Sequence, residues 1–211
     1  PAMTRGHTII ARGEVMQTFF RDRYEDMNAR HCNSALFRAF HEYGISRDMH
    51  KKITCSQFEK LFSDMVKQEI TTLIYHEVGE ISQRRILGKW WKELIMDFPY
   101  SRAELFLRNL KDTLADTCNT GMLSYIVRNK REGSLHFYMT LLKGFRKNIM
   151  PDIIPAYHDY LKTGNWEVLD EARKSGYKHA KQLANRLKDL NDQFKATPET
   201  IEKELMIYTT H

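Results

Sequence analysis

Three side chains that can bind a metal ion or transfer a proton share one face of an expected helix near the middle of the chain. Glu69, His76 and Glu80 lie within about 40° of one another when each residue advances by about 100°. The same sector carries Phe62 and Met65, so these polar groups face a core. A carboxylate in a core is costly unless it is paired, hydrogen-bonded or bound to a metal. The pattern therefore predicts either a metal site at Glu69, His76 and Glu80 or a buried polar network.

The polar-network alternative follows from the residues around this face. If Gly79 ends the helix, Glu80 leaves the apolar stripe and His76 lies in the last turn, where a cation suits the helix dipole. Glu69 would then pair with Arg23, which lies on the inner face of the first expected helix. Structural ion pairs of this kind imitate functional sites, so both hypotheses are kept.

The spacing from Glu69 to His76 also carries a resemblance to a class of enzymes. Glu-x6-His resembles the first ligand pair of the haem-oxygenase-like di-iron oxidases. The resemblance covers these two residues and their helical context, and it implies iron or another divalent metal as cofactor in an oxidase-type helical bundle. The later His-x3-Asp-x2-His cluster of that family has no counterpart at His136, His158 or His179.

A second pair of acidic residues also has the spacing of metal ligands. Asp112 and Asp116 are one helical turn apart, but they lie opposite the leucines of their expected helix. Arg108 precedes Asp112 by one turn, so we expect a solvated face with an Arg108–Asp112 ion pair. His136 lies with lysines on its expected helix, which also indicates a surface position.

Two further places are candidates for contact with a ligand or partner. Trp90 and Trp91 are adjacent on an expected helix, so they cannot both point to the same part of a core. One of them should therefore lie at a groove edge or an interface. His158 lies in a tyrosine-rich segment, where it either lines a pocket or belongs to a surface helix.

Charge and cysteine usage narrow the classes of function. The 211 residues carry a formal net charge of +6, which is mild for a dedicated nucleic-acid domain. The sequence has no phosphate-loop, dinucleotide-binding or His-Glu-x-x-His motif. Its three cysteines have neither disulfide-scaffold nor zinc-type spacing, so we expect a reducing cytoplasm. No run approaches the roughly 18 apolar residues that span a bilayer, so we expect no membrane association.

The elements that must position these residues are helices. The apolar period is close to 3.6, which predicts an all-α, single-domain bundle of about eight helices without a convincing strand. A further subdivision would make residues 1–53 an N-terminal helical hairpin packed on 54–211. The longest helix should be a C-terminal spine with a near-heptad seam of small residues, open to close packing or self-association. The expected helices include 13–30, 33–43, 56–79, 82–98, 134–149, 165–194 and one beginning at Thr197.

These observations lead to two hypotheses about function. The first is a cytoplasmic helical module that binds a partner protein or a small ligand, because no catalytic motif is present and one tryptophan should be accessible. The second is a non-haem metal oxidase that uses Glu69, His76 and Glu80. The two differ in what surrounds Glu69 and His76, which should be either a packed core or a cavity with converging ligands.

Overall fold

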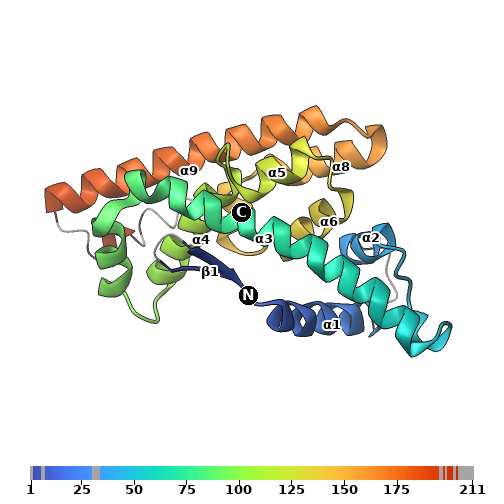
Figure 1. Cartoon of the computed structure of the whole chain (residues 1–211). Coiled ribbons are helices and arrows are strands. Elements are labelled where there is room, and N and C mark those ends of the chain that lie inside the picture. Colours follow the sequence, from blue (N-terminus) through green and yellow to red (C-terminus); the bar gives the residue numbers. More distant parts are fainter. Residues whose placement is uncertain are drawn as a thin grey trace.

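A computed structural model describes residues 2–5, 8–29, 34–194, 197, 199–201 and 203, which form an all-α helical bundle with one small β-hairpin (Figure 1). The helical period therefore predicted the fold class correctly. In chain order the elements are β1 (Ala2–Arg5), β2 (Thr8–Ala11), α1 (Gly13–Ala29), α2 (Ala35–Glu42), a 3₁₀ turn η1 (Met49–Lys51), α3 (Cys55–Asp97), α4 (Arg102–Thr117), α5 (Met122–Arg128), α6 (Glu132–Leu141), α7 (Phe145–Ile149), α8 (Ile153–Thr163) and α9 (Trp166–Phe194).

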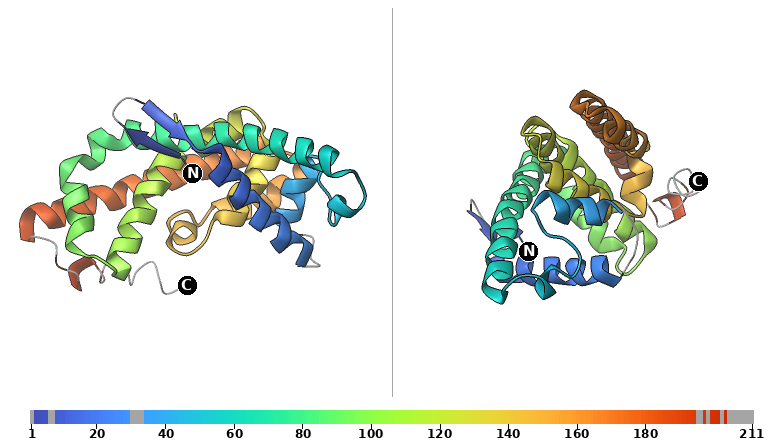
Figure 2. Two further views of the ribbon diagram at one scale, coloured as in Figure 1. Left: turned by 60° about the horizontal axis from the view of Figure 1, so that its bottom comes forward. Right: turned by 90° about the vertical axis from the view of Figure 1, so that its right-hand side faces the viewer.

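The helices are arranged so that α4 and α5 lie between α3 and α9. Both middle helices contact α3 on one side and α9 on the other, while α1 packs on α3 and α2 packs on α6 (Figures 1 and 2). The C-terminal helix α9 also contacts α7 and α8, so it is the packing spine that its apolar seam predicted. Small residues lie in that seam: a Cβ on Gly176 would press on the Met150 side chain, and Ala180 is fully buried.

The β-hairpin was not expected from the sequence. Its strands pair antiparallel with Ala2 opposite Ala11 and Arg5 opposite Thr8. Each strand has only four residues, which is too short for a two-residue period to stand out from a helical one. The hairpin lies against α3, where the Thr4 hydroxyl donates to Glu77.

The long central helix begins and continues differently from the prediction. It begins at Cys55, with Thr54 as the N-cap in a reciprocal capping box with Gln57. The helix does not end at Gly79. It runs on to Asp97, with a single non-helical residue at Gly88, where φ is 57° and ψ is −163°. Even the part before this kink is longer than α9, so the spine is not the longest helix as predicted.

Gly79 does not end α3. It allows a neighbouring helix to pack closely against α3. A Cβ at this position would overlap the backbone carbonyl of Ala115, and a Cβ at Gly121 would overlap the same carbonyl. The two glycines therefore allow the backbones of α3 and α4 and the turn before α5 to touch. A glycine that stops a helix and a glycine that admits a neighbouring helix look the same in one sequence.

The helix expected over 134–149 is in fact two helices. α6 ends at Leu141 and α7 begins at Phe145, because Gly144 adopts a positive φ of 55° between them. This break redirects the chain so that Arg146 reaches α4. The helix expected to begin at Thr197 falls largely outside the described residues.

We predict that Gly79→Ala will destabilise the protein by about 1–3 kcal/mol, because the added methyl meets backbone rather than a flexible side chain. Urea unfolding followed by circular dichroism measures this change. Gly13→Ala is the matched control, since its Cβ would meet only the tip of Ile70 at 3.8 Å. Equal stability of the two variants would show that α3 and α4 are not in backbone contact.

Candidate functional site

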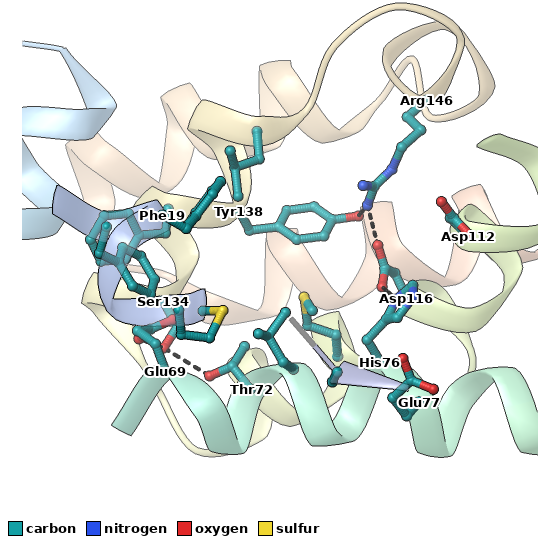
Figure 3. Close-up of a pocket in the computed structure, with 17 residues that line it drawn as sticks. Phe19, Glu69, Thr72, His76, Glu77, Asp112, Asp116, Ser134, Tyr138 and Arg146 are labelled. Atoms are coloured by element: carbon teal, nitrogen blue, oxygen red, sulfur yellow. Dashed lines mark hydrogen bonds and ion pairs between the residues drawn. The ribbon is translucent and has the colours of Figure 1, made fainter. Parts of the chain in front are cut away.

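A cavity of about 310 Å³ lies where α1, α3, α4 and α6 meet. Much of its wall is apolar, yet several ionisable side chains also face it, and the hairpin contributes Ala2 (Figure 3). The apolar lining residues are Met16, Phe19, Phe20, Leu73, Met122, Phe137 and Leu141. The ionisable lining residues are Glu69, His76, Glu77, Asp112, Asp116, Tyr138 and Arg146.

A buried carboxylate organises one side of the cavity. Asp116 is 1% exposed, and its Oδ1 lies 2.7 Å from Nδ1 of His76. Its Oδ2 accepts a hydrogen bond from the guanidinium of Arg146, which also donates to the Tyr138 hydroxyl at 3.4 Å (Figure 3). Asp116 thus joins α3, α4 and α7 through charged hydrogen bonds.

This arrangement contradicts the expectation of a solvated face at Asp112 and Asp116. Asp116 is buried and Asp112 is half-buried, and Arg108 pairs with Glu104 at 2.7 Å rather than with Asp112. The helical wheel identified the apolar side of α4 correctly but could not show that α3 and α7 cover the adjacent side. The unpredicted break before α7 is what brings Arg146 to Asp116.

The charges in this cluster hold one another in the ionised form. Burial alone raises the pKa of Asp116, but Arg146 and His76 outweigh it and the pKa is lowered. Burial lowers the pKa of His76, but Asp116 and Glu80 outweigh it and raise the pKa to about 10. Asp116 is therefore an anion and His76 a cation at neutral pH.

The other ring nitrogen of His76 faces a second group of side chains. Nε2 lies 3.4 Å from Oε1 of Glu80, which also accepts a hydrogen bond from Nζ of Lys111 at 2.5 Å. The hydrogen bond from His76 and the contacts with Lys111 lower the pKa of Glu80 to about 2, although burial opposes them. Ligand atoms of His76, Glu80 and Asp112 lie within 4.8 Å of one another.

The structure brings together only part of the metal trio expected from the sequence. His76 and Glu80 are adjacent because α3 continues through Gly79. Glu69 lies about two turns away, and Asp112 of α4 takes the third position. Asp112 was identified as a residue with metal-ligand spacing but was assigned to the surface.

Glu69 is buried, as its place on the helical wheel indicated, but it is held by hydroxyl groups. Tyr43, the C-cap of α2, and Ser134 of α6 both donate to its Oε1, Ser134 at 2.6 Å. The expected partner Arg23 instead pairs with Asp26 at 3.0 Å. Burial raises the pKa of Glu69, and the two hydroxyl groups only partly offset this.

The other candidate residues lie away from this cavity. Trp91 is buried and Trp90 is half-buried, a difference that adjacent helical positions require. His158 is exposed on α8. His136 is buried rather than on the surface, because α2 and α8 cover α6 from two sides. Its Nδ1 lies 2.9 Å from the Tyr157 hydroxyl, and burial lowers its pKa to about 4.

Comparison with known proteins places the chain in a family. Residues 17–207 match the model described as Family of unknown function (DUF6866) C-terminal domain. The chain belongs to this family. It matches no curated protein and no solved structure. The matched range contains every ionisable residue that lines the cavity.

None of the described helices of this family member combines sufficient length with sufficient apolar character to span a membrane.

We predict that His76→Gln will destabilise the protein most at low pH and that this destabilisation will decrease as the pH rises. The pKa of His76 is about 10 in the folded chain and about 6.5 when unfolded, so its protonation stabilises the fold fully below about pH 6.5 and progressively less up to about pH 10. Urea unfolding of wild type and variant at several pH values measures the difference. His158→Gln, at an exposed position, is the control. A difference that stays constant from pH 6 to pH 10 would contradict the assigned ion pair.

Proposed function

We propose that the chain binds a small organic molecule in the cavity between α1, α3, α4 and α6. The observation that carries this proposal is a cavity of about 310 Å³ whose apolar wall contains Glu69, Asp112 and Asp116. Ligand sites in proteins have volumes of about 300–1,000 Å³ and combine apolar walls with a few placed polar groups.

Ion pairs and hydrogen bonds fix the orientation of the polar groups in the cavity. Asp116 is held by two cationic groups, and Glu69 is held by two hydroxyl groups, one from the C-cap of α2 and one from α6. Such fixed groups recognise a ligand without a large ordering cost when it binds. The proposal includes the cytoplasmic location expected from cysteine usage, which the unbridged Cys55 and Cys118 support.

We predict that filling the cavity will abolish binding of small probes. Leu73→Trp places an indole ring against the cavity wall, whereas Ile81→Trp adds the same ring at an exposed position of α3 and serves as the control. Ligand-observed NMR with n-hexylamine, n-hexanol and n-hexanoate measures binding. At least one probe should bind wild type and the control with a Kd below about 1 mM and bind Leu73→Trp at least about tenfold more weakly. If all three proteins bind every probe equally, or none binds, the cavity is not a ligand site.

A second candidate function is binding of a divalent metal ion at His76, Glu80 and Asp112. Asp116 holds Nδ1 of His76, which leaves Nε2 on the side of Glu80. A carboxylate that orients a histidine in this way is a common support for a metal ligand. Imidazole and carboxylate groups together suit zinc, iron and manganese. The ammonium group of Lys111 occupies this position now, and His76 carries a proton on Nε2, so a metal ion would have to displace both.

We predict that Asp112→Asn will weaken metal binding at least about tenfold if this second site operates. Calorimetric titration of the purified protein with Zn²⁺ or Mn²⁺ measures it, with Glu93→Gln, an exposed acidic position on α3, as control. A matching loss in Glu69→Gln would instead favour the trio expected from the sequence. Failure of both metals to bind wild type would remove this candidate.

A further inference from the structure

The cavity carries acidic side chains at two separate places. Glu69 and Ser134 lie at one side of it, whereas His76, Glu77, Asp112 and Asp116 lie at the other, with Thr72 and Tyr138 between (Figure 3). Glu69 and His76 are seven residues apart on α3, which corresponds to about 10 Å along the helix axis. The cavity is therefore elongated between two polar groups.

The acidic groups that line the cavity outnumber its basic groups, although burial raises the pKa of both Glu69 and Asp112. Its two cationic residues, His76 and Arg146, are both engaged by Asp116. The cation nearest to Asp112 is Lys111, at 3.6 Å, and its Nζ lies closer to Glu80. Glu69 forms no ion pair with any described residue. The lining thus has more acidic than basic groups, and it suits a cationic ligand.

Glu69 retains an unused acceptor. Both hydroxyl groups that bind it donate to Oε1. No hydrogen bond from the described chain reaches Oε2, and this atom is not among the sealed polar atoms that lack a partner. An ammonium group in the cavity can therefore donate to Oε2.

The part of the wall between the two acidic places suits a hydrocarbon chain. Leu73 lies between Glu69 and His76 in the sequence of α3, and the Tyr138 ring lies between them in the close-up view. Neither side chain carries a charge at neutral pH, because burial raises the pKa of Tyr138 further above its ordinary value. Methylene groups of a ligand that lie there would be removed from water, which is favourable, and they have no hydrogen bonds to lose.

We propose that the ligand of this cavity is a linear aliphatic diamine or polyamine, with one ammonium group at Glu69 and another at Asp112. This inference rests on the proposed small-molecule function and names its ligand class. A monoamine would satisfy only one acidic end. A fatty acid or a dicarboxylate would place its charge against carboxylates, and like charges at such distances are unfavourable.

Calorimetric titration of the wild-type chain with 1,6-diaminohexane, n-hexylamine, n-hexanol and hexanedioate tests the inference. A chelator in every titration excludes trace metal as a bridge. The diamine should bind at least about tenfold more tightly than hexylamine, since it gains a second charge-assisted hydrogen bond. Hexanedioate should not bind. Affinity should also vary with diamine length from 1,3-diaminopropane to 1,8-diaminooctane, because both ends must be reached together.

Two variants assign the ends of the ligand. Glu69→Gln and Asp112→Asn should each lower diamine affinity to the level of hexylamine and leave hexylamine affinity within about threefold. Glu93→Gln is the matched control at an exposed position. If Glu69→Gln fails to fold, Asp112→Asn and the comparison of diamine with monoamine on wild type decide the question without it.

The outcomes separate this inference from the proposal on which it rests. If hexanol or hexanoate binds as tightly as the diamine, and Leu73→Trp abolishes that binding, the cavity is a ligand site and the diamine inference is wrong. If Leu73→Trp changes the binding of no probe, both fail. If the diamine binds tightly but Glu69→Gln and Asp112→Asn bind it as wild type does, the ligand lies elsewhere and the inference is overturned.

Discussion

The backbone contact between α3 and α4 at Gly79 and Ala115 is the constraint on which the rest of the site depends. Asp116 follows Ala115, and His76 precedes Gly79 by about one helical turn, so the contact places a carboxylate beside an imidazole. An isolated carboxylate at that depth would be strongly unfavourable. The chain offsets the cost with Arg146, which reaches Asp116 because the polypeptide breaks at Gly144.

The two ends of the cavity use different chemistry to bury a carboxyl group. Asp116 is surrounded by charged partners, which keep it ionised. Glu69 is surrounded by the hydroxyl groups of Tyr43 and Ser134, and burial raises its pKa. Removal of one partner from a buried ion pair is costly because the other charge remains. Asp116 is thus largely structural, while Glu69 has an acceptor to spare for a ligand.

Features of the fold and site that are set within one helix were predictable from the sequence, whereas features that depend on several helices were not. A period of 3.6 identified the helices, and the wheel of one helix showed that Glu69 points inward. The burial of Asp116 depends on neighbouring helices, and no wheel contains that information. Gly79 and Gly144 mark the limit most clearly. The first was predicted to end a helix and admits a neighbour, whereas the second lay inside a predicted helix and lies between two helices.

The short helix α7 is stabilised mainly by its contacts with the rest of the bundle. Five residues cannot sustain a helix on their own, so α7 depends on the packing of Phe145 and Ile149 and on the pairing of Arg146. Segments of this kind unfold locally at a lower free energy than the helices around them. Because fraying of α7 would leave Asp116 buried without Arg146, the Arg146–Asp116 pair is what keeps this turn folded against α4.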